Sequence, residues 1–524
     1  MEIMKKITTS NLKKKSISLK ISKTSKISKK KTKEMFTVLN PATLKPIGEL
    51  PVFSREMVEE KILIAKKEYS TWSKLSLKDR SKIILKFRKI LAQSREEMIS
   101  TICEETGKTR MDALIEVFAE CEATTYVAKK GIKYLSNEKR SSGLMQMKSC
   151  YVNYHPFGVV GIISPWNYPL ILSLNPILNA LMAGNTVVIK PSEITPYTTL
   201  KVQEFFKRAG LPDGALQVIT GKGETGAALV ESKNTDMICF TGSTRTGRII
   251  GEACGKMLKP VILELGGKDP MIVFEDADLV RAAKGALWGG FFNSGQTCIS
   301  VERVYVEKSV FQKFIEIVKN EYNHVRQGLT ENFPSVGSMT FDKQVEIVES
   351  HYSDAKKKGA NLILGGSRKL GHDGLFHEPS VVVNVSHEMK IMKEETFGPE
   401  IAIMEFSSEE EAINLANDTN YGLNASVWTK DSKKAKRVAE SIKSGSVCIN
   451  DCLTNYMISD LPFGGFKESG LGRVHGKEGI RAFAQSQSIM KNRWFWIFKK
   501  ELWWFPYSKR IYNLFSKAVD LLFG

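Results

Sequence analysis

Apolar and polar positions repeat with two different periods along this chain, and each period predicts a different kind of element. From residue 54 to about residue 133, apolar residues recur every three or four positions, which predicts amphipathic helices. After residue 157, short apolar runs alternate with helical stretches. These runs cover residues 159–163, 187–189, 216–219, 237–240 and 261–263. Strands that alternate with helices pair in parallel, so the pattern predicts an α/β fold with a doubly wound sheet.

The same alternation returns over residues 271–445 and predicts a second α/β domain. Residues 137–156 alternate around Gly143, which predicts strands in a projecting β-hairpin. Near the start of the body, residues 36–46 predict a strand followed by a turn. No apolar run reaches the roughly 18 residues that a membrane-spanning helix needs.

The charge of the chain is unevenly distributed. The formal net charge is +19, and residues 1–34 carry +10 of it through twelve lysines and two glutamates. We therefore expect no specific nucleic-acid partner for the rest of the chain. The tail itself is expected to be disordered, with a polybasic arm for anionic lipid or nucleic acid as the alternative. Without a secretory signal, we expect a cytoplasmic protein, or one held peripherally at a membrane surface.

The eight cysteines form no Cys-x-x-Cys pair, which indicates reduced thiols rather than disulfides or a zinc site. The histidines do not cluster, and we expect His372 and His377, in a Gly-rich stretch, to be solvated, so no metal site is predicted. Cys298 differs from the other cysteines because it ends the turn-forming run 293–297, between an expected helix and an expected strand. A cysteine on such a bend can present its sulfur to a cleft as a nucleophile.

Glu264 ends the last apolar run of the first sheet, just before two glycines. Burial there would raise the pKa of the carboxyl group and make it a better base near neutral pH. Two segments, Leu-Glu-Leu-Gly-Gly-Lys (263–268) and Phe-Phe-Asn-Ser-Gly-Gln-Thr-Cys (291–298), resemble the NAD(P)-dependent aldehyde dehydrogenase superfamily, and Cys298 follows Glu264 by 34 positions, as is typical of that family. The resemblance extends over about residues 36–492.

Asn167 lies in Ser-Pro-Trp-Asn-Tyr-Pro (164–169), directly after the first apolar run. An Asn amide at the end of a parallel strand can donate to an oxyanion, although Asn also favours Asx turns. The resemblance implies the oxyanion role for Asn167, with the backbone N–H of Cys298 as the second donor. It further implies that Cys298 forms a thiohemiacetal and then a thioester, which water activated by Glu264 hydrolyses to a carboxylic acid.

The resemblance also implies an NAD site. Its cofactor contacts would be Trp166, Lys190, Glu193, Gly223, Gly242, Ser243, Glu395 and Phe397. Lys190 and Glu193, otherwise readable as a surface ion pair, would hold the adenosine ribose. A carboxylate there repels a 2′-phosphate, so we expect NAD rather than NADP. Gly242 and Ser243 precede a helix and are better candidates for the pyrophosphate than the Gly-x-Gly-x-x-Gly match that contains Gly223. Glu395 and Phe397 would hold the nicotinamide ribose and pack near the nicotinamide.

The domain organisation that the resemblance implies starts with a Rossmann-type NAD-binding domain over residues 35–265, whose β-hairpin would serve oligomerisation. A catalytic domain over 266–446 follows, and 447–492 returns to the first domain. Homodimers or homotetramers are expected. The chain departs from the family at Pro176, where many members have Lys, and at Val474, where many have an acidic residue. Because that pair is linked to a proton relay, Glu264 must release its proton by another route.

Residues 493–524 combine four tryptophans, six cations and an amphipathic helical pattern from residue 507. These features predict an interfacial segment on a membrane surface, with packing on the body or across a dimer as the alternative. A membrane surface would favour medium- or long-chain, apolar aldehydes as substrates. A small semialdehyde such as succinate semialdehyde, or a non-catalytic membrane- or partner-binding role of the fold, are the other hypotheses.

Overall fold

The computed structural model describes residues 34–368, 373–497 and 500–524, and it divides the chain into two units, residues 1–34 and 35–524. The expected disordered tail lies outside the described residues. The second unit begins with an antiparallel pair, β1 (Met35–Leu39) and β2 (Pro46–Pro51), as the strand and turn predicted for residues 36–46 require. Four helices follow, α1 (Arg55–Trp72), α2 (Leu77–Gln93), α3 (Arg95–Thr106) and α4 (Arg110–Leu135).

A six-stranded sheet in the order β17-β9-β8-β5-β6-β7 contains every apolar run predicted between residues 159 and 263. Its strands are β5 (Val159–Ile163), β6 (Thr186–Lys190), β7 (Leu216–Val218), β8 (Met237–Thr241), β9 (Val261–Glu264) and the edge strand β17 (Gly470–Leu471). All pairs are parallel except β17 with β9. The predicted doubly wound arrangement is confirmed.

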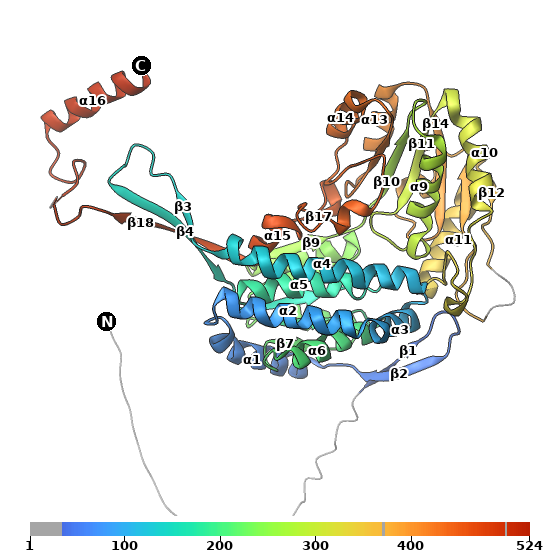
Figure 1. The fold of residues 1–524 in the computed structure, drawn as a ribbon, viewed down its shortest axis with the longest axis horizontal. Coiled ribbons are helices and arrows are strands. Elements are labelled where there is room, and N and C mark those ends of the chain that lie inside the picture. The colour runs from blue at the N-terminus through green and yellow to red at the C-terminus, as the bar shows by residue number, and fades with distance from the viewer. Residues whose placement is uncertain (1–33, 369–372, 498–499) are drawn as a thin grey trace, which may run out of the picture. The chain divides into compact units, whose positions relative to one another are not determined.

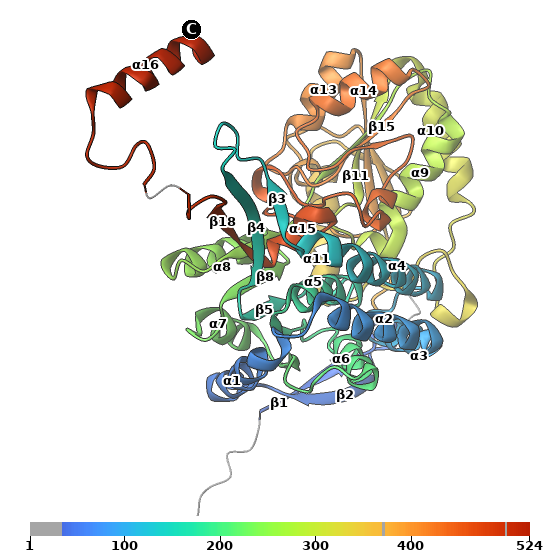
Figure 2. The same ribbon diagram turned by 60° about the vertical axis from the view of Figure 1, so that its left-hand side comes forward.

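Helices cover both faces of this sheet because both sets of alternating side chains are apolar (Figure 2). Val159 and Ile163 pack with α1, α7 (Gly223–Glu231) and α8 (Thr244–Lys256). Val160 and Ile162 pack on the opposite face with α5 (Ile171–Ala183) and α6 (Tyr197–Ala209), and α2 and α4 lie outside these helices. The carboxyl ends of the strands are left free for the loops that carry the site residues.

The second sheet has the order β12-β13-β14-β11-β10-β15-β16, with only β12 antiparallel. Its strands are β10 (Asp269–Val273), β11 (Val301–Glu307), β12 (Asn361–Leu364), β13 (Ser380–Val383), β14 (Glu400–Phe406), β15 (Ser426–Trp428) and β16 (Cys448–Ile449). The helices around it are α9 (Leu279–Phe291), α10 (Phe311–Tyr322), α11 (Asp342–Lys357), α12 (Lys390–Lys393), α13 (Glu409–Asn417) and α14 (Ser432–Ser441). It accounts for the α/β pattern predicted over 271–445.

A third sheet contains the predicted hairpin. Strands β3 (Glu138–Arg140) and β4 (Lys148–Pro156) are antiparallel, and β18 (Ala484–Asn492) pairs with β4 over nine residues after the short helix α15 (Gly476–Ala482). Figure 1 shows these strands projecting away from the helices α2 and α4. The last helix, α16 (Lys509–Phe523), has no buried side chain.

Two histidines, His372 and His377, were expected to be solvated. His377 is buried, so the expectation that it is solvated was wrong, and His372 lies outside the described residues. Burial lowers the pKa of His377 and keeps it neutral.

Among the described residues, no three His, Cys, Asp or Glu side chains gather as a metal site would need. None of the helices described there is long and apolar enough to cross a bilayer.

Candidate active site

The loop that carries Cys298 connects α9 to β11 through a strained turn. Asn293, Ser294 and Gly295 all have positive φ angles, of 54°, 56° and 70°. A Cβ atom on Gly295 would lie 1.9 Å from the carbonyl oxygen of Gly398, so only glycine fits there. The buried Gln296 side chain fixes the loop by accepting from the Thr340 N–H at 2.8 Å and donating to the Asn293 carbonyl at 3.0 Å. The loop therefore holds the half-buried Cys298 thiol in a defined place.

An apolar cavity of about 220 Å³ ends at Cys298. It is lined by Ile115, Ala119, Tyr168, Ile171, Leu172, Trp288, Phe292, Thr297, Cys298, Ile299, Leu453, Thr454, Tyr456 and Met457. The Tyr168 hydroxyl and the Thr297 hydroxyl hydrogen-bond to one another at 2.7 Å, which removes two polar groups from the cavity wall. No Lys, Arg or His belongs to this lining in the described part of the chain.

Glu264 lies on the other side of Cys298, in a cavity of about 20 Å³ that both residues line. The Glu264 side chain is buried, and its two carboxyl oxygens accept no hydrogen bond from the described residues. Burial raises the pKa of Glu264 well above the ordinary carboxyl value, and the nearby Arg473 only partly offsets this effect. A buried carboxyl group with free lone pairs beside a thiol can act as a general base.

Asn167 lies in the turn between β5 and α5, and its buried side chain contacts the cysteine loop. Its amide nitrogen donates to the carbonyl of Gln296 at 3.0 Å, two residues before Cys298, which leaves its second amide hydrogen for another acceptor. The buried Lys108 donates to the Asn167 carbonyl at 2.8 Å and pairs with Glu116. Glu116 accepts in turn from the backbone N–H groups of the first turn of α5. This network orients the Asn167 turn against the thiol.

The thiol of Cys298 is difficult to ionise in the free protein. Burial raises its pKa, and the carboxyl groups of Glu395, Asp269 and Glu264 raise it further. A buried thiol with this pKa needs a base to take its proton when it attacks. Glu264 shares a cavity with it and meets that requirement.

The residues predicted to bind the adenosine ribose lie together at the ends of β6 and β7. Lys190 donates to the carbonyls of Pro191 and Gly221 at 2.9 Å each, and to Glu193 at 3.4 Å. Its stem also packs near Gly226 of α7, so the glycine-rich run that contains Gly223 lies beside Lys190. Glu193 is partly exposed and reaches the wall of a large cavity.

Gly242 and Ser243 form the turn from β8 into α8. Ser243 is the N-cap of the helix, and its hydroxyl accepts from the Thr246 N–H. The Gly242 N–H donates to the Glu264 carbonyl at 3.0 Å, which ties this turn to the strand that carries the base. A helix N-terminus at the carboxyl end of a parallel strand suits a phosphate group.

Glu395 and Phe397 are brought to the same region by a buried carboxylate. Glu302 of β11 accepts from the backbone N–H groups of Thr396 and Phe397 and pairs with Lys268. Glu395 itself accepts from the Gly267 N–H at 3.0 Å. The ring of Phe397 meets the ring of Trp166 edge-on at 5.4 Å, so two predicted cofactor residues are in contact.

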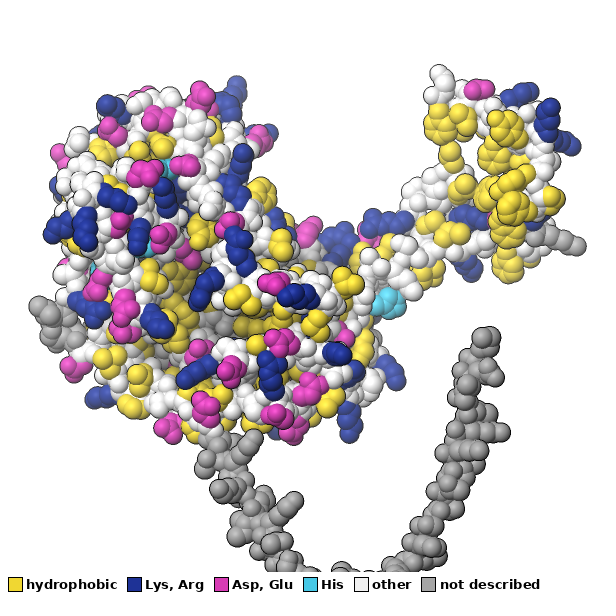
Figure 3. Space-filling view, turned by 180° about the vertical axis from the view of Figure 1, so that it is seen from behind, with side chains coloured by type: hydrophobic (Ala, Val, Ile, Leu, Met, Phe, Trp, Pro, Cys, Tyr) yellow, Lys and Arg dark blue, Asp and Glu magenta, His cyan; other side chains and the backbone are white. Residues whose placement is uncertain are grey.

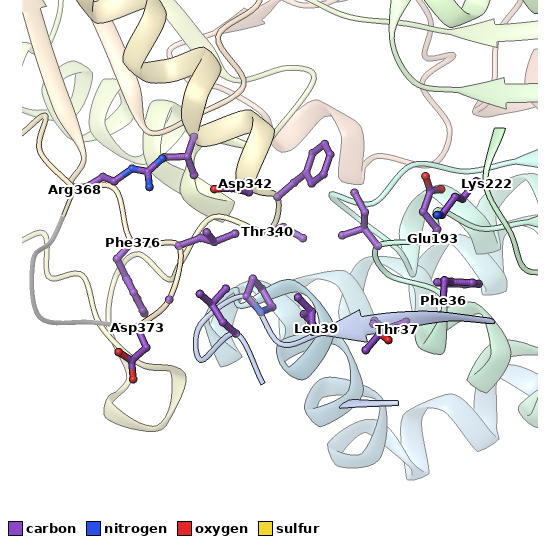
Figure 4. A pocket seen from close by; sticks show the side chains of 18 of the residues that line it. Phe36, Thr37, Leu39, Glu193, Lys222, Thr340, Asp342, Arg368, Asp373 and Phe376 are labelled. Carbon is purple, nitrogen blue, oxygen red and sulfur yellow. The ribbon is translucent and has the colours of Figure 1, made fainter. Parts of the chain in front are cut away.

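A cavity of about 850 Å³ lies between β1, the Glu193 turn and the segment before α11 (Figure 4). Figure 4 shows Glu193 and Lys222 on one side and Arg368 and Asp373 on the other. Phe341 lines this cavity and packs on Trp166 at 6.2 Å. Glu193, predicted to bind the adenosine ribose, therefore lies on the wall of this cavity, and Phe341 connects the cavity wall with the ring of Trp166.

Sequence reasoning missed the buried charged residues that support the backbone around the site. The side chains of Lys108, Glu116, Lys268 and Glu302 are buried. Lys108 pairs with Glu116, eight residues along the chain, and Lys268 pairs with Glu302, 34 residues along. Glu302 gave one signal, because a charged residue inside an apolar strand normally needs a buried partner. Nothing in the sequence identified that partner or the contact of Asn167 with the Gln296 carbonyl.

Comparisons with known proteins agree with this geometry. The sequence pattern of the aldehyde dehydrogenase family matches residues 27–489. The chain is 39% identical to a 4,4'-diapolycopene aldehyde oxidase of Methylomonas sp., over 93% of this chain and 91% of that protein. It is also 39% identical to a putative succinate-semialdehyde dehydrogenase [NADP(+)] of Mycolicibacterium smegmatis, over 86% and 87% of the two chains. A crystal structure of betaine aldehyde dehydrogenase from Staphylococcus aureus in complex with NAD+ superimposes with a TM-score of 0.85 at 33% identity, covering 90% of this chain and 94% of that one.

Proposed function

The chain belongs to the aldehyde dehydrogenase family, whose enzymes depend on NAD(P), and from this premise we propose that it oxidises apolar aldehydes to carboxylic acids with NAD. The apolar cavity that ends at Cys298 carries this proposal. Its lining matches a hydrocarbon chain, because burying apolar surface is favourable at about 25 cal/mol per Å².

The reaction follows from the side chains around the thiol. Glu264 takes the proton of Cys298, and the thiolate adds to the aldehyde carbon to form a thiohemiacetal. The Asn167 amide and the Cys298 N–H donate to its oxyanion. NAD, when bound, would supply the acceptor for the hydride that the thiohemiacetal oxyanion expels as it becomes a thioester. Glu264 releases the thiol proton to solvent and then takes a proton from the water that attacks the thioester. The carbon–sulfur bond breaks, the acid leaves, and the Cys298 thiolate recovers a proton from Glu264.

The residues present fit a dinucleotide. Lys190 and Glu193 would hold the adenosine ribose, Gly242 and Ser243 the pyrophosphate beside Gly223, and Glu395 the second ribose next to Phe397 and Trp166. The carboxyl group of Glu193 supports NAD over NADP because it would repel a 2′-phosphate. The relative from M. smegmatis carries NADP(+) in its name, so this preference requires a direct test.

Two other functions are weaker. A semialdehyde with a carboxylate, as in the name of the M. smegmatis relative, would meet no cation among the residues lining the cavity at Cys298. Burying an unpaired carboxylate there would be costly. A non-catalytic role would not require the cysteine loop, Glu264 and Asn167 to converge as they do.

The test is NADH formation across saturated aldehydes of two to sixteen carbons, with succinate semialdehyde in parallel. We expect kcat/KM to rise with chain length up to the capacity of the cavity. Cys298→Ala should abolish turnover, whereas Cys121→Ala, at another half-buried cysteine on α4, should leave it within about twofold. Succinate semialdehyde as the best substrate would overturn the apolar assignment, and no turnover of any aldehyde would overturn the enzymatic one.

We further propose that residues 493–524 contact an anionic membrane surface. Large apolar side chains are exposed in this segment, among them Phe495, Trp496, Phe505, Tyr507, Tyr512, Leu521 and Phe523. Figure 3 shows hydrophobic side chains gathered over α16 and the preceding loop, with Lys and Arg side chains at the margin. Exposed aromatic residues combined with cations are typical of interfacial segments.

Vesicle flotation tests this contact. The full chain should float with phosphatidylserine-containing vesicles, and a chain ending at residue 492 should not. The tail requires its own control, a chain starting at residue 35, because it is also basic. Equal flotation of the full chain and the chain ending at residue 492 would exclude the segment as the contact.

The sheet of β3, β4 and β18 supports a homodimer or homotetramer. Its nine-residue pairing extends away from the body, and one edge of β18 has no partner strand in the described chain. Unpaired edges promote association between chains. Light scattering on purified protein would give the number of copies, and a monomer would contradict this proposal.

A further inference from the structure

A cluster of buried polar side chains adjoins the small cavity that Glu264 and Cys298 line. It consists of Asn175 and Asn179 on α5 and His475 just before α15. We propose that Asn175, held by His475 and Asn179, positions the water that hydrolyses the thioester. This inference rests on the proposed aldehyde oxidation and assigns a residue to its second half.

The 20 Å³ cavity beside Glu264 provides the place for this water. Asn175, Glu264 and Cys298 all line it, and Tyr456, Phe463 and Val474 close it with apolar surface. A volume of roughly 15 Å³ is enough for one water molecule, provided that polar partners are present. Both oxygens of Glu264 lack a partner among the described residues, so they can accept from that water.

The orientation of the Asn175 amide follows from its two partners. Asn179 donates to the Asn175 oxygen at 3.2 Å and to the Val474 carbonyl at 3.1 Å. The Asn175 oxygen is therefore an acceptor, and its nitrogen faces the Nε2 atom of His475 at 2.9 Å. One amide hydrogen goes to His475, and the second is free to point into the cavity that Asn175 lines.

His475 can accept this hydrogen bond because it is neutral. Burial lowers its pKa to about 4, so the ring is neutral at neutral pH. The tautomer with the proton on Nδ1 leaves the lone pair of Nε2 for the Asn175 N–H. The rings of Tyr456 and Phe463 pack on the imidazole at 4.6 and 5.9 Å and fix its plane. His475 is thus a positioning residue that acts through Asn175.

In the hydrolytic step, protons then pass only between the water, Glu264 and Cys298, all within this cavity. The water accepts from Asn175 and donates one proton to Glu264, while its oxygen bonds to the thioester carbon. The bond between that carbon and the sulfur of Cys298 breaks, and the thiolate recovers a proton from Glu264. With Pro176 and Val474 in the lining, the cavity wall itself offers no ionisable group there except Glu264, the two cysteines Cys239 and Cys298, and Tyr456.

Stopped-flow measurement of NADH separates the two halves of the reaction. In Asn175→Leu the first turnover should occur at a rate within about threefold of the wild type, with an amplitude of one NADH per site. Steady-state turnover should then fall at least tenfold. Hydroxylamine, which attacks a thioester without a positioned water, should restore turnover in this variant and change the wild type by less than twofold.

A second pair of variants tests whether His475 holds Asn175 in place. His475→Phe should resemble Asn175→Leu, and His475→Gln, whose side-chain oxygen can accept from Asn175, should retain most of the activity. Bound NAD, followed by fluorescence, shows that each variant is folded. Equal slowing of the first turnover and the steady state, or no effect of hydroxylamine, would overturn the role of Asn175. No NADH from the wild type would instead refute the proposed oxidation.

Discussion

At the scale of single residues, the site depends on groups whose ionisation is displaced by burial. Glu264 is the clearest case, because nothing among the described residues hydrogen-bonds to its carboxyl group. Because its pKa is raised, the Glu264 carboxyl group stays protonated up to a higher pH than an ordinary carboxyl group does. The base that hydrolysis needs therefore forms only as the pH rises.

Glu264→Gln should slow both halves of the reaction, because Glu264 is the base for the thiol and for the water. We expect the first turnover and the steady state each to fall by about 100-fold, since general-base catalysis contributes roughly 10²–10⁴. In the wild type, steady-state turnover should fall with decreasing pH along a limb well above pH 4.5. A pH–rate profile that is flat down to pH 5 would contradict the role of Glu264.

Glu193 determines cofactor choice in our proposal. Glu193→Gln keeps the size of the side chain but removes the charge that repels a 2′-phosphate. The ratio of kcat/KM for NADP to that for NAD should rise about tenfold. Glu224→Gln, at an exposed acid in the first turn of α7, is the matched control and should leave the ratio unchanged. An equal shift in both variants would indicate a general charge effect.

At the scale of elements, the cysteine loop concentrates backbone strain at one turn. Gly295→Ala would bring a Cβ atom into the Gly398 carbonyl at a positive φ angle. The free energy of unfolding should fall by about 3 kcal/mol, since strained backbone and overpacking each cost roughly 1–3 kcal/mol. Urea unfolding measures this loss.

The matched control for that substitution is Gly255→Ala in α8, where the added methyl group would meet no atom within 4 Å. Alanine is a better helix former than glycine by about 1 kcal/mol, so this variant should be slightly more stable than the wild type. A similar loss in both variants would show that the loop is not specially strained.

The sequence predicted the strands and helices better than the contacts between residues that are distant in the chain. Strands β5 to β9 are short apolar runs because both faces of their sheet are covered, so composition alone marks them. Cys298, Glu264 and Asn167 could be named because each stands next to a turn, in a segment that resembles the aldehyde dehydrogenase family. Glu302, 94 residues from the backbone of Thr396, and Asn175, 300 residues from His475, could not be paired from sequence. Such pairs depend on which strand ends the fold brings together.

At the scale of the whole molecule, the C-terminal segment and the catalytic side chains do not overlap. Among the described residues of 493–524, none lines the cavities at Cys298. Removing this segment should therefore leave kcat/KM for a water-soluble aldehyde such as hexanal within twofold. Turnover of a C16 aldehyde dissolved in anionic vesicles should fall at least fivefold. Equal loss on both substrates would place the segment in folding or assembly instead.

The separation of the cavities around Cys298 has a consequence for how this enzyme can adapt. In our proposal the substrate-facing side chains come mainly from α4, α5, α9 and residues 453–457. The residues proposed for the dinucleotide lie at or after the ends of β5, β6, β7 and β8 and between α12 and β14. Mutations that reshape one wall leave the other intact. Substitutions in the apolar lining should therefore change which aldehydes bind while the oxidation chemistry stays the same.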